Sequence, residues 1–443
     1  MEWKPNTTPT QAASRLRTPQ LKNSSTGKTE ELIQPHLSLY VALNYINPKF
    51  PTKSFAPVGV CYIQHQPLQT LHVRTQPSPH QQMKIVHVVY SLEMGGAEIL
   101  VAQLCRLQRA NGHDVSVCAY SNLGPLGEVL RAEGIRVDVL GEAPFTSTFL
   151  RFFREFRALR PNVVHCHNPA PTLQAAIPGR LTGASCVLST RHSLVAPPYD
   201  TSAEIIYSFV SLFCNWIVGI CDATRENLRH APLARRSRIV RVYNGVDKLA
   251  PIAPEDCPSK QGFTLLFVGR LAAIKDLPTM IRAIALAVPR VPDLQLWIVG
   301  HGAVRQELED LVRQLGIEKH VTFWGERLDV AHFFSAADVY AMSSVSEGLP
   351  MSLLQAMSVG LPALVTDVGG MAEVIRNSDC GICTPVGDST KMAEAIVGLA
   401  ADPARRDVFA TNASAAYNAH FTLEQMNAAY MEFYRNPKQR GAF

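Results

Sequence analysis

The chain has 443 residues, of which 47% are hydrophobic and 18% are charged. This length and balance favour a globular protein of two or three domains and exclude a largely disordered chain. The formal net charge is +5, and residues 1–82 account for it, with eight Lys and Arg against three Asp and Glu. Because the remainder is close to neutral, we expect no broad basic surface for nucleic acid.

Residues 1–82 are rich in Pro, Thr, Ser and Gln and show no sustained hydrophobic period. This composition predicts a disordered extension or a misassigned start, because Met83 opens the first apolar strand pattern. The alternative, a targeting or docking arm, is disfavoured because the segment has no Arg-rich amphipathic pattern.

No run of 18 apolar residues and no basic segment followed by an apolar core is visible, so we expect a cytoplasmic protein without a membrane span.

The ten cysteines are scattered, as is typical of reduced thiols. Cys380 and Cys383 form a C-x-x-C pair, but no second ligand pair lies nearby. A strand flanking Gly381 is therefore favoured over a metal or redox site.

Short apolar segments alternate with helical patterns from residue 83 onward. The expected strands are residues 83–89, 115–120, 137–140, 163–167, 186–190, 216–220 and 238–243. Strands that alternate with helices predict a parallel, doubly wound sheet, here an N-terminal Rossmann-like domain over 83–248. A Pro-rich stretch predicts a linker over 249–260.

A second alternating series follows the linker. Its expected strands are residues 263–268, 294–299, 321–324, 339–342 and 363–365. The series predicts a second Rossmann-like domain over 261–420. The last segment, 421–443, has Thr422 as a suitable N-cap before an amphipathic run, which predicts a closing C-terminal helix.

Glycines and cations follow the first strands of both series. Gly95 and Gly96 open a helix, where backbone amides can approach an anion, although a plain tight turn also favours glycine. In the second series, Arg270 and Lys275 follow the first strand, and Gly300 follows the next. Ligands bind at the carboxyl ends of parallel strands, so these residues predict a diphosphate site, with solvated surface cations as the alternative.

The segment 343–350 immediately precedes another helical pattern and contains Ser344. The backbone amides of Gly348 and Leu349 are placed to hold a phosphate at the start of that helix. Glu347 can accept hydrogen bonds from sugar hydroxyls or offset a positive centre. A Glu at this position can also be explained by favourable dipole electrostatics alone.

Taken together, the motifs resemble those of the family 4 retaining glycosyltransferases over nearly all of residues 83–435. The matching segments, in family order, are Gly95-Gly96, residues 244–247, Arg270 with Lys275, residues 344–360 and residues 367–373. The resemblance implies a GT-B fold, in which two Rossmann-like domains face a cleft. It also implies transfer of a sugar from a UDP or GDP type donor to a saccharide or lipid-linked acceptor, in polysaccharide or glycolipid assembly.

The resemblance assigns roles to four residues. Arg270 and Lys275 would hold the leaving diphosphate, while Glu347 would position the sugar. His192, just after the expected strand 186–190, would contact the sugar or the acceptor. His165 and His167 on a neighbouring strand are rival candidates.

Neither a metal nor another cofactor is expected, because no Asp-x-Asp motif occurs and the two cations can take the electrostatic role of a metal. No carboxylate of the first domain is an obvious nucleophile opposite Glu347. Attack and departure on the same face of the sugar are therefore favoured.

Gln355 departs from the family pattern, which has a second Glu eight positions after the one at 347. In the family, that position is associated with the ribose hydroxyls of the nucleotide. Gln can accept one hydrogen bond there but carries no charge, and packing on the helix surface is an equal alternative. The departure leaves open a non-catalytic nucleotide-sugar-binding protein, and a nucleotide-sugar epimerase of the GT-B type would share the diphosphate site.

Residues 148–160 interleave Phe with Arg along a helical pattern. Such a helix can dock on anionic lipid, which would give peripheral membrane contact. The favoured interpretation is a helix that buries its Phe stripe against the first sheet.

Overall fold

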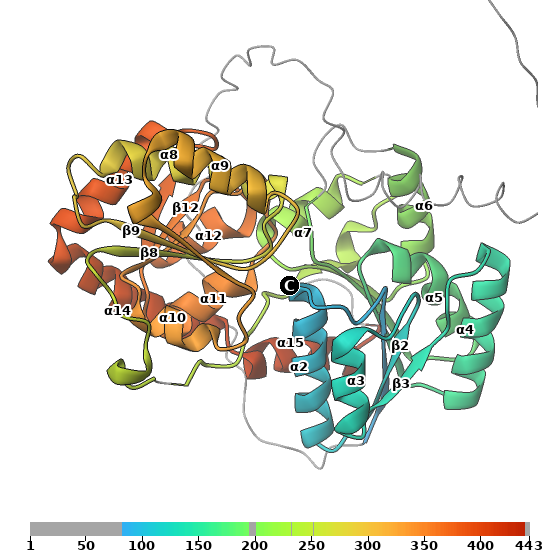
Figure 1. The fold of residues 1–443 in the computed structure, drawn as a ribbon. Helices are drawn as coiled ribbons and strands as arrows, with labels where there is room; N and C mark the ends of the chain where they lie inside the picture. The colour runs from blue at the N-terminus through green and yellow to red at the C-terminus, as the bar shows by residue number, and fades with distance from the viewer. Residues whose placement is uncertain (1–81, 195–200, 232, 251, 439–443) are drawn as a thin grey trace, which may run out of the picture. The chain divides into compact units, whose positions relative to one another are not determined.

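The computed structural model describes residues 82–194, 201–231, 233–250 and 252–438. All of them belong to one compact unit. Within it the chain forms two parallel β-sheets with helices on both faces (Figure 1). The disordered extension expected over 1–82 lies outside the described residues, except for residue 82.

The first sheet has seven strands in the order β3-β2-β1-β4-β5-β6-β7. Its strands are β1 (Lys84–Val89), β2 (Asp114–Ala119), β3 (Arg136–Val139), β4 (Val163–His167), β5 (Cys186–Arg191), β6 (Trp216–Gly219) and β7 (Ile239–Arg241). The order reverses between β1 and β4, which pair in parallel. Ligands bind at the carboxyl edge beside such a reversal.

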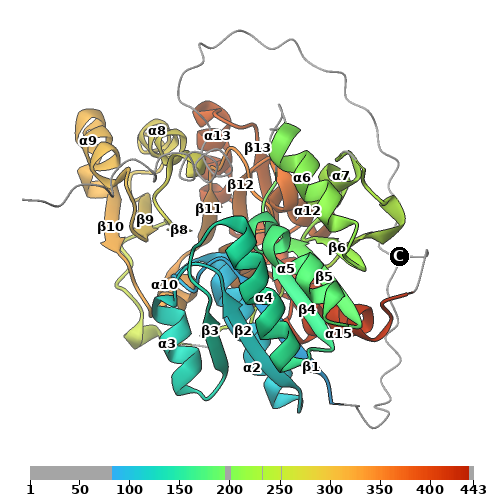
Figure 2. The same ribbon diagram turned by 90° about the vertical axis from the view of Figure 1, so that its right-hand side faces the viewer.

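Six helices connect these strands. They are α2 (Gly96–Ala110), α3 (Gly124–Ala132), α4 (Phe145–Leu159), α5 (Pro169–Leu181), α6 (Thr201–Ser211) and α7 (Asp222–Arg229). Figure 2 shows α4 and α5 side by side on one face of the sheet. Because side chains alternate along a strand, even-numbered residues of β1 and β4, such as Val86 and Val164, pack with α4 and α5.

The second sheet has six strands in the order β10-β9-β8-β11-β12-β13. Its strands are β8 (Thr264–Val268), β9 (Gln295–Val299), β10 (Val321–Gly325), β11 (Val339–Met342), β12 (Ala363–Thr366) and β13 (Gly381–Thr384). The order reverses between β8 and β11, which places a second candidate binding edge at their carboxyl ends.

The second sheet is covered by seven helices. They are α8 (Leu277–Ala287), α9 (Arg305–Leu315), α10 (Val330–Ala336), α11 (Met351–Ser358), α12 (Gly369–Ser378), α13 (Ser389–Ala401) and α14 (Pro403–His420). The described residues also form four short 3-10 turns: η1 (Arg236–Arg238), η2 (Pro254–Asp256), η3 (Ala273–Lys275) and η4 (Glu318–His320). The predicted fold class, two doubly wound α/β units, is confirmed.

The last helix, α15 (Leu423–Arg435), follows the second sheet in sequence but packs on the first one. Thr422 caps it by accepting a hydrogen bond from the Gln425 amide at 3.2 Å. Its residues Tyr430 and Phe433 are buried with Trp216 of β6. The chain therefore returns to the first sheet, on the face that α2 also covers.

The helix with interleaved Phe and Arg is α4. Phe152 and Phe156 are fully buried against the first sheet and α5, as the packing interpretation expected. Phe145 and Leu150 are about half exposed, at 52% and 51%. Among the described residues, no helix is both long and apolar enough to cross a membrane.

Candidate active site

The carboxyl edge of the second sheet begins with a close approach between two turns. The Gly269 amide after β8 donates to the Val299 carbonyl of β9 at 3.0 Å. Gly300 has a φ of 140°, and a Cβ there would collide with the Gly269 carbonyl oxygen. Only glycine fits this position. The predicted turn at Gly300 therefore allows the loops after β8 and β9 to pack closely and leaves room for a ligand at this edge.

Lys275 and Glu347 form an ion pair at the same edge. Both side chains are mostly buried, with 16% and 14% of their surface exposed. Ser344 donates from Oγ to the same carboxylate oxygen, Glu347 Oε1, at 2.9 Å. Ser343 holds the Lys275 turn by donating from Oγ to the Lys275 carbonyl at 2.9 Å. The loop after β11 therefore positions both charged groups.

Arg270, which follows β8, is exposed. Burial raises the pKa of Glu98 in the first turn of α2, and the positive charge of Arg270 opposes this rise. The sequence predicted Arg270 and Lys275 as a pair of cations on one diphosphate. In the structure, Lys275 is neutralised by Glu347, whereas Arg270 faces a carboxylate of the first sheet's helix.

The start of α11 brings loops from both sheets together. A Cβ on Gly348 would lie 2.7 Å from the His192 carbonyl oxygen, and a Cβ on Gly96 would touch the Met351 sulfur at 4.0 Å. In the described part of the chain, the amides of Gly348 and Leu349 donate to no other group. These two amides are available to an anion at the positive end of the helix.

His192 follows β5 and is held by its backbone. Asn168, at the end of β4, has a φ of 73° and accepts a hydrogen bond from the His192 amide through Oδ1 at 3.0 Å. The preceding Arg191 makes a buried, two-fold ion pair with Glu204, at 2.7 and 2.6 Å. The buried Nδ1 atom of His192 contacts no hydrogen-bond partner in the described residues.

His167 and His87 continue inward from His192. His192 Nε2 lies 3.1 Å from His167 Nδ1, and His167 Nε2 lies 3.0 Å from His87 Nδ1. His87 Nε2 in turn lies 2.9 Å from Gln108 Oε1 on α2. Burial lowers the pKa of His87 and of His192 to about 4, and that of His167 well below its usual value. All three rings are therefore neutral near pH 7.

His165 belongs to a separate branch of the same buried cluster. Its Nδ1 atom lies 2.6 Å from the Tyr434 hydroxyl of α15, and its Nε2 atom lies 2.8 Å from Thr190 Oγ1. Nitrogen atoms of His87, His165 and His167 all lie within 4.8 Å of one another. Both nitrogens of each ring already have protein partners, so hydrogen bonding accounts for the cluster without a metal ion.

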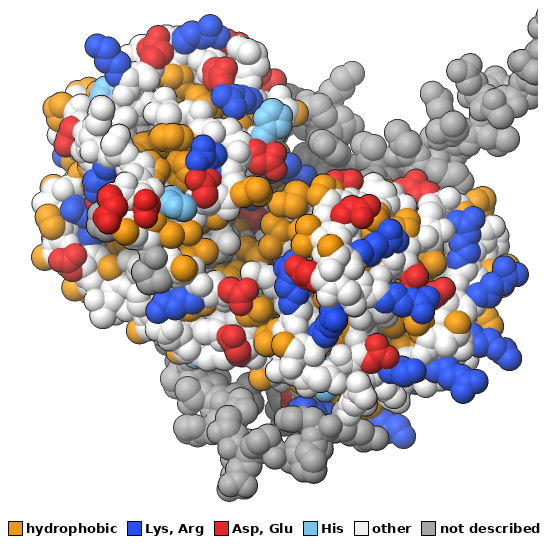
Figure 3. Space-filling view, turned by 60° about the horizontal axis from the view of Figure 1, so that its bottom comes forward, with side chains coloured by type: hydrophobic (Ala, Val, Ile, Leu, Met, Phe, Trp, Pro, Cys, Tyr) orange, Lys and Arg blue, Asp and Glu red, His pale blue; other side chains and the backbone are white. Residues whose placement is uncertain are grey.

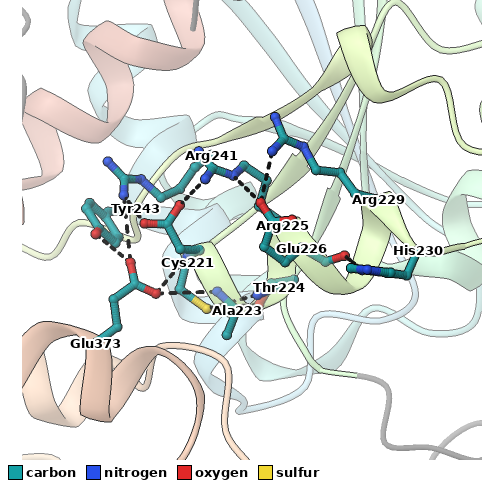
Figure 4. A network of polar contacts seen from close by, with 11 residues as sticks. Cys221, Ala223, Thr224, Arg225, Glu226, Arg229, His230, Arg241, Tyr243 and Glu373 are labelled. Carbon is teal, nitrogen blue, oxygen red and sulfur yellow. Dashed lines mark hydrogen bonds and ion pairs between the residues drawn. The ribbon is translucent and has the colours of Figure 1, made fainter. Parts of the chain in front are cut away.

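Glu373 of α12 joins the second sheet to the first (Figure 4). Its Oε2 atom accepts from the Asp222 amide at 2.8 Å, at the start of α7. Its Oε1 atom accepts from the Tyr243 hydroxyl at 2.6 Å. Arg241 stacks over the Tyr243 ring and pairs with Asp222 at 2.5 Å. Burial raises the pKa of Glu373 to about 7.

Gln355 lies on α11, one turn after the helix start, and its side chain is half-buried. Its carbonyl accepts a hydrogen bond from Ser358 Oγ at 2.7 Å. The side chain thus lies on the helix that follows the free amides of Gly348 and Leu349.

Sequence reasoning missed the roles of His87, Gln108 and Glu373. His87 and His165 are register partners across β1 and β4, and this pairing cannot be read before the strand order is known. The signal available in the sequence was the polar residue in an otherwise apolar strand. A buried polar side chain requires a hydrogen-bond partner.

Two Rossmann-like sheets, with glycine turns, cations and a free helix start at their carboxyl edges, form the arrangement of the GT-B fold. Residues 94–248 match the family described as Glycosyltransferase Family 4, and residues 255–416 match Glycosyl transferases group 1. The chain belongs to the family 4 glycosyltransferases.

Named relatives agree with this assignment. The chain is 24% identical to UDP-Gal:alpha-D-GlcNAc-diphosphoundecaprenol alpha-1,3-galactosyltransferase of Escherichia coli, over 73% of this chain and 90% of that protein. It is 27% identical to phosphatidyl-myo-inositol mannosyltransferase of Mycolicibacterium smegmatis, over 73% and 86%. The crystal structure of Anabaena HepE in complex with UDP-glucose has a TM-score of 0.71 at 20% identity, over 80% of this chain and all of that one.

Proposed function

We propose that this glycosyltransferase moves a sugar from a nucleoside diphosphate donor to a saccharide or lipid-linked acceptor with retention of anomeric configuration. The observation that carries the proposal is the meeting of Lys275, Glu347 and the start of α11 with the His192 backbone. One edge thereby offers groups for a diphosphate and groups for a sugar.

The diphosphate would bind at the start of α11. The amides of Gly348 and Leu349 offer donors to phosphate oxygens. Arg270, which is exposed and follows β8, offers a guanidinium at the carboxyl edge of the same sheet. Lys275 can exchange part of its contact with Glu347 for the incoming phosphate charge. HepE was crystallised with UDP-glucose, which supports a uridine diphosphate donor as the first choice, with a guanosine diphosphate donor as the alternative.

The reaction breaks the bond between C1 of the sugar and the diphosphate oxygen and forms a bond between C1 and an acceptor oxygen. The acceptor proton passes to the departing diphosphate, whose charge the cations and amides stabilise. Glu347 is held by Lys275 and Ser344, so it serves better to orient the sugar than to attack it. We therefore propose attack on the face from which the diphosphate leaves.

A lipid-linked acceptor is consistent with two relatives, whose names specify a diphosphoundecaprenol and a phosphatidylinositol acceptor. Figure 3 shows Lys and Arg side chains along its right-hand border, the side on which Figure 1 places α4. Arg151, Arg154 and Arg157 of this helix are exposed, next to the half-exposed Leu150. We propose that α4 makes the peripheral contact with an anionic membrane.

The donor is tested by thermal stabilisation of the full chain with UDP and GDP sugars, because a ligand of the folded state raises apparent stability. We expect one nucleotide class to raise Tm, and Arg270→Ala to abolish the rise. Arg290→Ala, an exposed arginine after α8, is the matched control and should leave the rise intact. The absence of a shift with every donor would contradict the proposal.

Transfer is tested with the donor found in that way and a panel of saccharide and lipid-linked acceptors. We expect a new glycoside whose anomeric proton coupling matches that of the donor sugar. Inversion would refute the retaining course. Release of a free epimerised sugar without acceptor would instead identify an epimerase, and binding without any turnover would identify a nucleotide-sugar-binding protein.

A further inference from the structure

A column of three hydrogen bonds runs through the interior of the first sheet from His192 to α2. It joins His192 Nε2 to His167 Nδ1 at 3.1 Å, His167 Nε2 to His87 Nδ1 at 3.0 Å, and His87 Nε2 to Gln108 Oε1 at 2.9 Å. The side chains of His87, His167 and Gln108 are buried, at 0%, 3% and 0% exposure. The column is therefore shielded from water at its inner end.

The protons in this column can be counted. A neutral imidazole carries one N–H, on either Nδ1 or Nε2, and a hydrogen bond between two rings requires one donor and one acceptor. The rings are neutral because burial disfavours the imidazolium and no carboxylate of the described residues forms a hydrogen bond with the column. Fixing the proton at one end thus fixes it on every ring.

Gln108 supplies the fixed end. Its Oε1 atom can only accept, so His87 must carry its proton on Nε2 and leave Nδ1 bare. His167 must then donate from Nε2 to that bare nitrogen, and His192 must donate from Nε2 to His167 Nδ1. The single N–H of neutral His192 is therefore on Nε2, where it donates to His167, and the Nδ1 atom of His192 carries no proton and can only accept.

The opposite amide orientation would reverse every bond. The structure places Gln108 Oε1 toward His87, and Gln108 Nε2 is buried without a hydrogen-bond partner among the described residues. The tautomer measured for the three rings distinguishes this amide orientation from the opposite one.

The free end of the column is the second observation. His192 Nδ1 is buried, and no described residue is its hydrogen-bond partner. A buried nitrogen without a partner costs free energy, and this one belongs to the residue whose carbonyl approaches Gly348 at the start of α11. A bound ligand that donates a hydrogen bond to His192 Nδ1 would remove this cost.

We propose that Gln108 is a positioning residue which, through His87 and His167, holds His192 in the Nε2–H tautomer, so that Nδ1 accepts a hydrogen bond from a hydroxyl of the sugar substrate. The inference rests on the proposed function and deepens it, because it specifies that His192 accepts, and the sugar donates, the hydrogen bond between them. A hydroxyl is selected over an acceptor-only substituent, since two acceptors cannot pair.

The wild-type enzyme tests the tautomer directly. Two-bond ¹H–¹⁵N correlation spectra distinguish a bare ring nitrogen from a protonated one, and loss of a signal in His192→Asn identifies that ring. We expect His87, His167 and His192 all to be Nε2–H at pH 7. A spectrum with the proton of His192 on Nδ1 would overturn the inference whether or not any variant folds.

Gln108→Met tests the cause, because it keeps the length of the side chain and removes the acceptor. We expect His192 to become a mixture of tautomers and kcat to fall about three- to tenfold with KM nearly unchanged, the effect of one neutral hydrogen bond. The matched control is Gln103→Met on the same helix, whose side chain bonds Asp247 outside the column. It should leave the tautomer and kcat unchanged.

Two further measurements distinguish failure of the proposed function from failure of the inference about Gln108. If the wild-type enzyme transfers no sugar, the proposed function is refuted. If the wild type transfers sugar but the His192 tautomer is unchanged in Gln108→Met, only the role of Gln108 is refuted. One equivalent of tightly bound metal in the purified enzyme would also overturn the inference, because a metal bound by His87, His165 and His167 would break the hydrogen bonds of the column.

Discussion

Lys275 and Glu347 are joined by an ion pair across 72 positions of sequence, at the carboxyl edge where the second sheet reverses its strand order. Lys275 reaches it from the turn η3, and Glu347 reaches it from the loop before α11. Each side chain is mostly buried, so neither charge is easily compensated by water once its partner is removed.

Lys275→Met should therefore weaken both folding and catalysis. The variant leaves the Glu347 carboxylate with Ser344 as its remaining side-chain donor, and we expect the free energy of unfolding to fall by roughly 2 kcal/mol. Adding Glu347→Gln should recover most of that loss but not turnover. Urea unfolding and donor turnover measure the two effects. Lys391→Met, which removes an exposed ion pair of α13, is the control, and full activity of the double variant would contradict the assigned roles.

Glu373 should make stability fall as pH rises through the weakly acidic range. Burial raises its folded pKa from 4.5 to about 7, so between those values the folded protein binds more protons than the unfolded chain. Stability then decreases with rising pH, by at most about 3 kcal/mol across the window. Its neighbours Asp222, Arg241 and Tyr243 face the carboxylate directly.

The measurement for Glu373 is the difference in urea midpoint between wild type and Glu373→Gln at several values of pH. The difference isolates this group, because the buried histidines act in the opposite direction: their folded pKa values are lowered, so they reduce stability as pH falls below about 6.5. The glutamine variant should gain stability relative to wild type above pH 7. A difference that does not vary with pH would refute the assignment.

Gly348→Ala should disturb the contact between the loop before α11 and the loop after β5. A Cβ at this position would lie 2.7 Å from the His192 carbonyl and 2.8 Å from the Ile220 side chain, so one of the loops must move. We expect turnover to fall at least about tenfold, because small misplacements of substrate-positioning groups are costly. Gly398→Ala, inside α13 with open space around it, should instead stabilise by about 0.5–1 kcal/mol. Equal activity of the two variants would contradict the site.

Gln355→Glu should strengthen donor binding if this side chain contacts the ribose of the nucleotide. A carboxylate makes stronger hydrogen bonds to hydroxyls than an amide does, by roughly a factor of two in energy. We expect the donor Kd, measured by calorimetry, to fall several-fold, while acceptor KM is unchanged. An unchanged donor Kd would show that Gln355 serves only the surface packing of α11.

The arginines of α4 should control membrane attachment. Arg151, Arg154 and Arg157 project from a helix whose buried side is satisfied by Phe152 and Phe156. Replacing Arg154 and Arg157 with Gln should abolish sedimentation with vesicles that contain anionic lipid and leave Tm unchanged. Arg151 is kept, because it donates hydrogen bonds to the Leu140 and Gly141 carbonyls. A parallel replacement of two exposed arginines, Arg282 of α8 and Arg313 of α9, is the control. Equal sedimentation of both variants would refute the membrane role of α4.

The elements of both sheets were within reach of sequence reasoning. The expected strands 163–167 and 339–342 coincide with β4 and β11, and the other expected strand ends differ by one or two residues. A short apolar run bounded by glycine indicates a strand that is buried on both faces of a parallel sheet. This pattern can be recognised from neighbouring residues alone. The strand β7 begins one residue later than expected because residues 236–238 form a 3-10 turn.

Only the tertiary structure decided which residues meet. The ion pair between Lys275 and Glu347 joins two segments that are far apart in the sequence, and the expected roles of these residues on the diphosphate and the sugar stay predictions. His87, His167 and Gln108 come from two strands and a helix, and their contacts depend on the pairing of β1 with β4 and on the position of α2. The sequence by itself determined the family, the alternation of strands and helices, and the loops that carry charge. Contacts between distant segments depend on strand order and register, which local patterns do not encode.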